Sequence, residues 1–165
     1  MTTDDRVVRL AGGYLDEYLG KIRYCLDRLD DDQVWWRPSP GANSIGNLVL
    51  HLCGNLTQWL LGGLGGEPDH RQRDLEFSAD RTVSRAELGR RLAGVVKRCR
   101  ALVATLDEKA LAARQEVQDS RTDGLGVLVH VVEHMSYHTG QLLYLRKQSL
   151  QHGDRLELYP QHRRE

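Results

Sequence analysis

Three histidines at a spacing of four, His130, His134 and His138, constrain the fold more than any other feature of this sequence. An α-helix turns by about 100° per residue, so a step of four returns each side chain to nearly the same face. Apolar residues between Val127 and Leu145 share that face. Because a buried imidazole needs a hydrogen-bond partner or a metal, either each histidine is satisfied separately or two of them hold an ion.

Helix geometry limits how many of these histidines can bind one ion. His130 and His138 lie about 12 Å apart along the axis, at a rise of about 1.5 Å per residue. A ligating nitrogen lies only about 2.0–2.1 Å from zinc. Two histidines four residues apart can therefore share an ion, whereas His130 and His138 cannot. The pair is therefore either His130 with His134 or His134 with His138. A third ligand must come from elsewhere, and His51 alone among the other histidines lies in an apolar helical run.

The segments around these histidines resemble the DinB-like superfamily. The matching stretches are NSIGNLVLHL at 43–52 and HVVEHMSYHTGQLLYLRK at 130–147, and WWRPSPGANS at 35–44 resembles the family's entry into its second helix. The resemblance extends from the first helix to about residue 150. It implies an all-α fold, a four-helix bundle of the DinB-like type.

The resemblance also implies a ligand set. The family carries one histidine on its second helix and an HxxxH pair on its fourth. In this sequence that pattern maps onto His51, His134 and His138 as ligands of a divalent ion, most readily zinc or nickel, and leaves His130 outside the set.

Four segments with helical periodicity are expected to form the long helices of one domain that spans residues 1–165, with a peripheral tail from about residue 151. A long polar loop is expected between the second and third helices, and no strand is expected. Residues 66–77, GEPDHRQRDLEF, are interpreted as solvated. The helices are expected at about 4–29, 44–61, 84–106 and 124–149, with one further helical turn at about 108–113.

Polar residues near the histidines are candidates for the surroundings of the metal. Gln141 and Asn55 are candidates to accept a hydrogen bond from a ligating imidazole. Asn47 and Asn55 lie one turn before and after His51, so they either face the same cavity or bond the backbone or a neighbouring helix. His130 is expected to line the open side of the site as a pocket residue. The tryptophans are interpreted as packing residues.

Composition narrows the partners and the compartment. Lys plus Arg and Asp plus Glu are 23 each, so the net charge is zero and no nucleic-acid surface is indicated. No run approaches the roughly 20 apolar residues of a membrane span, and the N-terminus lacks a signal-peptide core. Three widely spaced cysteines predict reduced thiols and a cytoplasmic location. We expect a homodimer through the first and third helices, with an exposed apolar end at residues 60–64.

Three neutral imidazoles leave a divalent ion its charge and an open coordination position, which favours chemistry over a purely structural site. Some DinB-like relatives transfer low-molecular-weight thiols such as bacillithiol or mycothiol. The resemblance therefore implies a metal-dependent transferase that activates a small thiol toward an electrophile. The alternatives are a metal-dependent hydrolase that uses bound water and a non-enzymatic metal-binding stress protein. The sequence does not identify the catalytic residues.

Overall fold

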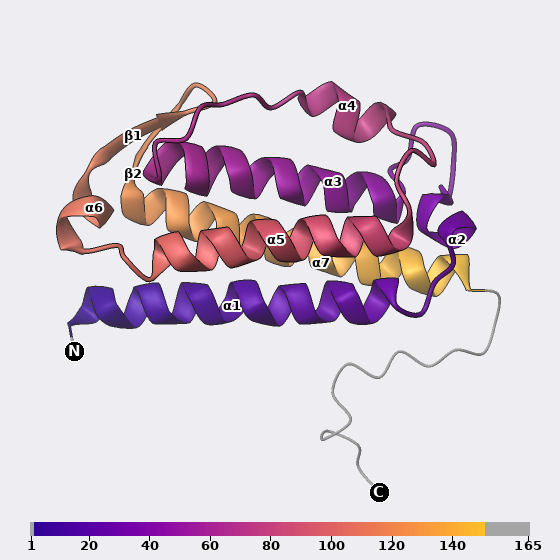
Figure 1. Cartoon of the computed structure of the whole chain (residues 1–165), viewed down its shortest axis with the longest axis horizontal. Helices are drawn as coiled ribbons and strands as arrows, with labels where there is room; N and C mark the ends of the chain where they lie inside the picture. The colour runs from indigo at the N-terminus through magenta and orange to yellow at the C-terminus, as the bar shows by residue number, and fades with distance from the viewer. Residues whose placement is uncertain (1, 151–165) are drawn as a thin grey trace, which may run out of the picture.

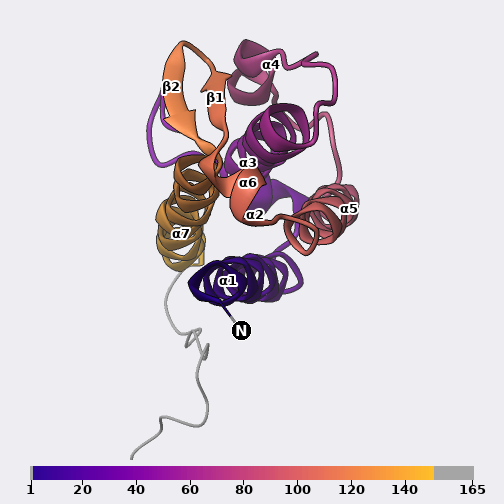
Figure 2. The same ribbon diagram turned by 90° about the vertical axis from the view of Figure 1, so that its left-hand side faces the viewer.

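The computed structural model describes residues 2–150, and the predicted tail from about residue 151 lies outside them. The described chain is mainly helical, and its four long helices lie side by side (Figure 1). Seen end-on, α1 and α3 each pack against both α5 and α7 (Figure 2). The long helices are α1 (Thr3–Leu26), α3 (Ile45–Leu56), α5 (Arg85–Val103) and α7 (Gly124–Ser149).

Side-chain caps start the long helices where the sequence predicted. Ser44 and Ser84 each accept a hydrogen bond from the third backbone N–H of the helix that follows. Asp123 caps α7 in the same way. At Ser84 only half of a capping box forms, because the Glu87 carboxylate pairs with arginines of its own helix.

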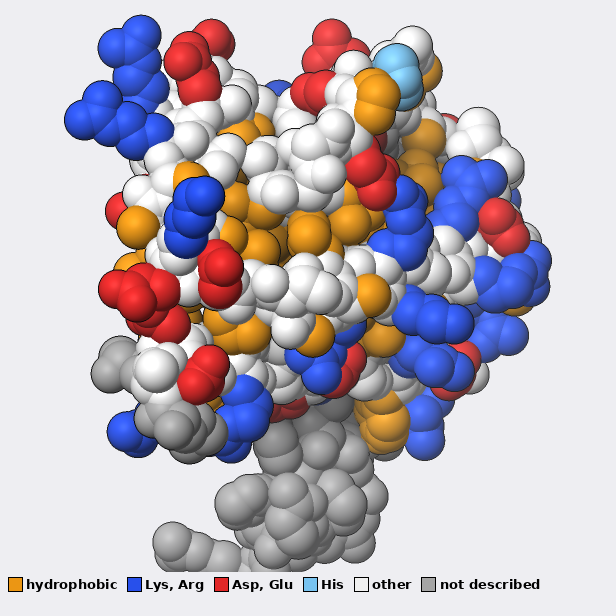
Figure 3. Space-filling view, turned by 60° about the vertical axis from the view of Figure 1, so that its left-hand side comes forward, with side chains coloured by type: hydrophobic (Ala, Val, Ile, Leu, Met, Phe, Trp, Pro, Cys, Tyr) orange, Lys and Arg blue, Asp and Glu red, His pale blue; other side chains and the backbone are white. Residues whose placement is uncertain are grey.

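Apolar side chains from every long helix fill the space between them. They include Leu15 and Ile22 of α1, Leu48 and Leu52 of α3, Leu88 and Leu92 of α5, and Val127 and Val131 of α7, all buried. Within residues 2–150 no helix is long and apolar enough to cross a membrane. The face in Figure 3 carries basic and acidic side chains intermixed, with hydrophobic side chains gathered between them.

Three short helices and one hairpin connect the long helices. Of these, only the turn at α6 was predicted, and the expectation of a chain without strands was wrong. The two strands pair antiparallel, with Arg114 opposite Asp123, at the end of the molecule near α6 (Figure 1). These elements are α2 (Asp31–Trp35), α4 (Arg73–Ser78), α6 (Glu108–Ala112), β1 (Arg114–Val117) and β2 (Ser120–Asp123).

The second long helix continues past α3 as a π-helix, η1 (Thr57–Leu64). Its residues Leu60 and Leu61 are buried, so the exposed apolar end predicted at 60–64 was wrong for these two side chains. The hairpin packs closely here: a Cβ on Gly63 would lie 2.9 Å from Cγ2 of Val117.

The segment between η1 and α5, predicted to be a solvated loop, instead packs back onto α3. Its helix α4 lies on the outer side of α3, away from α1 (Figures 1 and 2). We call residues 67–79 the strap. The Asn47 side-chain amide donates to the carbonyls of Glu76, Phe77 and Ala79 at 2.9, 3.2 and 2.8 Å. One side chain of α3 therefore holds the end of α4 in place.

Candidate metal centre

Three histidines from two helices meet between α3 and α7. Nε2 of His134 lies 3.1 Å from Nε2 of His51 and 3.2 Å from Nε2 of His138. One ring nitrogen from each lies within 4.8 Å of the others, so the cluster could hold a metal ion. His51 is buried in α3, while the other two side chains are partly buried one turn apart on α7.

The donor chemistry of this cluster fits a cation. A ring nitrogen that lacks a proton is an acceptor, and two acceptors cannot bond each other. Nε2 of His134 faces two other Nε2 atoms, so a single proton on it satisfies only one contact at a time. A divalent ion accepts lone pairs from all three.

Electrostatics keep the central imidazole neutral. Burial lowers the pKa of His134 most, and the neighbouring histidines lower it further, to about 3. Burial likewise lowers the pKa of His138, although its hydrogen bond to Gln141 opposes the shift. Neutral imidazole is the form that binds metal, so the environment favours the ligating state.

The far nitrogen of His51 is held by the strap. Nδ1 of His51 lies 2.9 Å from Oε2 of Glu76. Arg71 donates to both carboxylate oxygens, from Nε to Oε1 at 2.7 Å and from Nη2 to Oε2 at 2.8 Å. Burial raises the pKa of Glu76, but the hydrogen bonds from Arg71 and His51 and the charge of Arg71 outweigh it, so that the pKa lies below its usual range.

These contacts correct the interpretation of residues 66–77 as solvated for Arg71, Glu76 and Phe77, whereas the other nine residues are exposed. Glu76 is only 9% exposed, and the Phe77 ring lies 4.8 Å from the His51 ring. Sequence reasoning missed Glu76 and Arg71, because no spacing links them to His51. One weak signal was present: Gly54 interrupts a helical run, where glycine lowers helix stability unless packing requires it. A Cβ at Gly54 would lie 1.9 Å from Oε1 of Glu76.

The other two histidines of the cluster differ in their outer contacts. Nδ1 of His138 lies 2.7 Å from Oε1 of Gln141, the oxygen partner that the sequence predicted as a candidate. Nδ1 of His134 is buried and has no hydrogen-bond partner among the described residues. The described chain therefore fixes the ring orientation of two of the three imidazoles through a side-chain oxygen.

The remaining candidates lie outside the cluster. The Asn47 side chain accepts a hydrogen bond from the Ser44 backbone and donates to the strap. Of the two roles considered for Asn47, it therefore bonds the backbone and does not face the metal cavity. The Asn55 amide lies 3.3 Å from Nε2 of His130, so it contacts that histidine and not a member of the cluster. The His130 ring lies against the Trp59 ring, with centroids 3.9 Å apart and the planes tilted by 32°. Trp59 is buried, as expected of a packing residue.

The protein's own thiols are poorly suited to react. Burial raises the pKa of Cys25, Cys53 and Cys99 to about 12. The thiols of Cys25 and Cys99 also lie within hydrogen-bonding range of the backbone carbonyls of Leu142 and Leu56. A thiolate is the nucleophile and the metal ligand, so these cysteines are unsuited to either role.

The fold and the sequence pattern define the family. The sequence model of the DinB superfamily matches residues 14–142 of this chain. The chain therefore belongs to the DinB superfamily. No curated protein matches it significantly in sequence.

Solved structures share this fold at low sequence identity. A conserved protein from Enterococcus faecalis superposes with a TM-score of 0.73 at 16% identity, over 89% of this chain and 96% of that one. A DinB-like protein from Bacillus cereus gives 0.66 at 18% identity, over 83% and 91%. A DinB-like protein from Bacillus subtilis gives 0.65 at 15% identity, over 84% and 91%. At these identities the likeness extends to the fold alone.

Proposed function

We propose that this protein binds one divalent ion, zinc or nickel, through His51, His134 and His138 and activates a low-molecular-weight thiol for transfer to an electrophile. The observation that carries the proposal is the convergence of three Nε2 atoms, with the opposite nitrogens of His51 and His138 facing side-chain oxygens. The long helices serve as a four-helix bundle scaffold that holds the ligands.

The ligand set favours an open site. No cysteine or carboxylate joins the three histidines in the cluster within residues 2–150. A three-histidine site on a divalent ion leaves a position for an exogenous ligand, and the ion would supply Lewis acidity there that lowers the pKa of a thiol or of water. The role of the chain is to fix the three imidazoles and to keep its own cysteine thiols away from the open coordination position.

The surroundings favour a thiol over hydrolysis by bound water. A hydrolase commonly uses a carboxylate or a histidine as general base. Glu76 is occupied by Arg71 and contacts His51 on Nδ1, the side opposite the cluster. Glu133, the residue directly before His134, is exposed, and His130 is engaged by Asn55 and Trp59. A small thiol needs no such base once its pKa is lowered, and the family resemblance points the same way.

The test combines metal analysis with thiol titration. The purified protein should contain about one zinc or nickel ion per chain, in line with a single three-histidine site. After substitution with cobalt, the ligand-field spectrum should shift when cysteine or a larger thiol is added. Transfer to a chromogenic electrophile should then require both thiol and metal. A spectrum that no thiol changes would favour the hydrolase or the non-enzymatic alternative.

The homodimer remains a proposal, and the structure suggests a different face for it. Exposed apolar side chains gather on α1 and α7, around a groove of about 640 Å³. The predicted dimer contact through the first and third long helices would instead need such side chains on α5, where none of the large exposed hydrophobic residues of the described chain lies. They include Leu10, Tyr14, Val129 and Tyr137. Light scattering of wild type and of Leu10→Glu should give a dimer and a monomer.

A cytoplasmic location remains a prediction from the free cysteines.

A further inference from the structure

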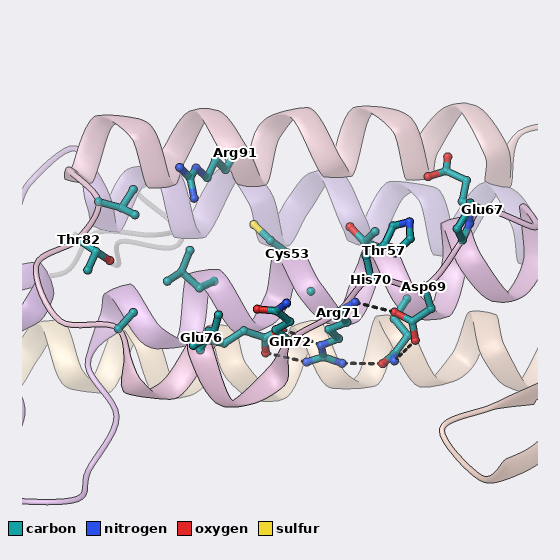
Figure 4. Close-up of a pocket in the computed structure, with 17 residues that line it drawn as sticks. Cys53, Thr57, Glu67, Asp69, His70, Arg71, Gln72, Glu76, Thr82 and Arg91 are labelled. Carbon is teal, nitrogen blue, oxygen red and sulfur yellow. Dashed lines mark hydrogen bonds and ion pairs between the residues drawn. The ribbon is translucent and has the colours of Figure 1, made fainter.

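We propose that Glu76 and Arg71 of the strap are positioning residues for the metal, because they hold His51 with Nδ1 protonated and Nε2 aimed at the other two histidines. The inference rests on the proposed function and extends the site to a segment that carries none of its ligands. Figure 4 shows the strap side chains from the side of a cavity of about 560 Å³, which lies between the strap and α5. The guanidinium of Arg71 lies on this side of the strap, beside Glu76.

The hydrogen-bond donors and acceptors around His51 indicate which of its ring nitrogens carries the proton. A carboxylate that accepts two hydrogen bonds from a guanidinium is ionised and has only lone pairs to offer. Oε2 of Glu76 lies 2.9 Å from Nδ1 of His51. An unprotonated Nδ1 at that distance would set lone pair against lone pair. Toward Glu76, Nδ1 therefore acts as the donor, which leaves the lone pair of Nε2 for a metal.

A competing arrangement exists, and the contacts disfavour it. Nη2 of Arg71 also lies 3.0 Å from Nδ1 of His51, so it could donate there if Nε2 held the proton. That choice would weaken the charge-assisted bond from Nη2 to Oε2 of Glu76, which is shorter at 2.8 Å. The carboxylate thus selects the tautomer, and Arg71 keeps the carboxylate ionised and in position.

Arg71 is itself held in position before any ligand binds. Its side chain is 5% exposed, and Nη1 donates to Oε1 of Gln58 at 2.9 Å. Its backbone N–H donates to Asp69 at 2.9 Å. These contacts reduce the side-chain freedom that would otherwise be lost when His51 is fixed.

Gly54 supplies the space that this arrangement needs. A Cβ there would lie 1.9 Å from Oε1 of Glu76 and 2.8 Å from Nε of Arg71. Glycine inside a helix costs roughly 0.5–1 kcal/mol relative to alanine, so its presence here is explained by the approach of the two strap side chains. Gly54→Ala should displace Glu76 from His51 without changing any charge.

The experiment measures zinc affinity by competition with a chromophoric chelator. Glu76→Gln, Gly54→Ala and the double variant Arg71→Gln/Glu76→Gln should each bind zinc about 10–100-fold more weakly than wild type, the usual cost of losing an oxygen partner of a ligating histidine. The double variant removes both buried charges together, so it avoids leaving one of them unpaired.

Two matched controls separate positioning from a general loss of structure. Glu67→Gln alters another carboxylate of the strap, which pairs with Arg98 on the surface. Gly94→Ala places a methyl group in α5, where nothing lies within 4 Å. Both should bind zinc as the wild type does. Circular dichroism of the metal-free proteins should show intact helices, and ¹⁵N shifts of His51 should report Nδ1–H in wild type and a tautomer mixture in Glu76→Gln.

The outcomes distinguish this inference from the proposed function. If Glu76→Gln and Gly54→Ala fold and bind zinc as tightly as wild type, the positioning role is wrong and the metal site stands. If Glu76→Gln does not fold, the zinc affinities of Gly54→Ala and the double variant decide the question by the same criterion. If the wild type itself binds no divalent ion, the proposed function fails and the positioning role fails with it.

Discussion

Two adjacent layers of the contact between α3 and α7 contain histidine, but only one brings imidazole nitrogens together. In the first, His51 meets His134 with their Nε2 atoms 3.1 Å apart. In the second, one turn away, His130 meets the Asn55 amide at 3.3 Å and packs against the tilted ring of Trp59. Spacing along α7 is the same in both layers. The facing helix therefore decides which histidine can become a ligand.

The strongest way to break this comparison is to remove one histidine from each layer. His134→Ala should lose stoichiometric metal, because only two imidazoles then remain and they come from different helices. His130→Ala should keep the wild-type metal content, measured by atomic emission after dialysis. Metal loss in His130→Ala together with retention in His134→Ala would reverse the assignment of the layers.

Trp59→Ala sharpens the contrast by testing what the second layer contributes. Loss of a buried tryptophan should lower the free energy of unfolding by about 3–5 kcal/mol, because it leaves a cavity beside His130. Metal content should not change. Chemical denaturation of the metal-free protein measures the loss, and Trp36→Ala, at a side chain that is 38% exposed, is the control and should have a much smaller effect.

Gln141→Ala tests the outer contact of the first layer. It removes the oxygen that faces Nδ1 of His138, so zinc affinity should fall by about tenfold. Asn55→Ala removes the corresponding side chain of the second layer and should leave zinc affinity unchanged. Equal losses in the two variants would show that the layers are not distinct.

The comparison also predicts a difference in the acid stability of the metal-free protein. The pKa of His134 is lowered to about 3 by burial and by its neighbours, while an unfolded histidine titrates near about 6.5. As the pH falls below about 6.5, the unfolded state takes up this proton and the folded state does not, so stability falls. His134→Ala should flatten this slope, measured by denaturation from pH 7 to 4, more than His130→Ala does.

The sequence predicted the scaffold well where helices are long and capped. Helix α7 begins at Gly124 and ends at Ser149 as expected, since Asp123 starts it and its apolar periodicity is continuous. The hairpin was missed because its turn residues, Gln118 and Asp119, adopt positive φ without the glycine that usually marks such a turn.

The candidate site was predictable only in part, for a different reason. Spacing alone left two possible pairs on α7, and the resemblance selected His134 with His138. Glu76 comes from a short helix whose position depends on tertiary hydrogen bonds to Asn47. No local pattern encodes such a docking, so the oxygen partner of His51 could not be derived from periodicity.

Asn47 couples the first turn of α3 to the strap. Its Oδ1 accepts from the Ser44 backbone at the first turn of α3, and its amide holds the carbonyls of α4. We therefore expect fraying of the first turn of α3 to weaken the docking of the strap, although Arg37 and His51 also hold it. Backbone amides of the two segments should exchange with deuterium as one cooperative unit. We expect the local opening rate of this unit to limit how fast a chelator reaches His51.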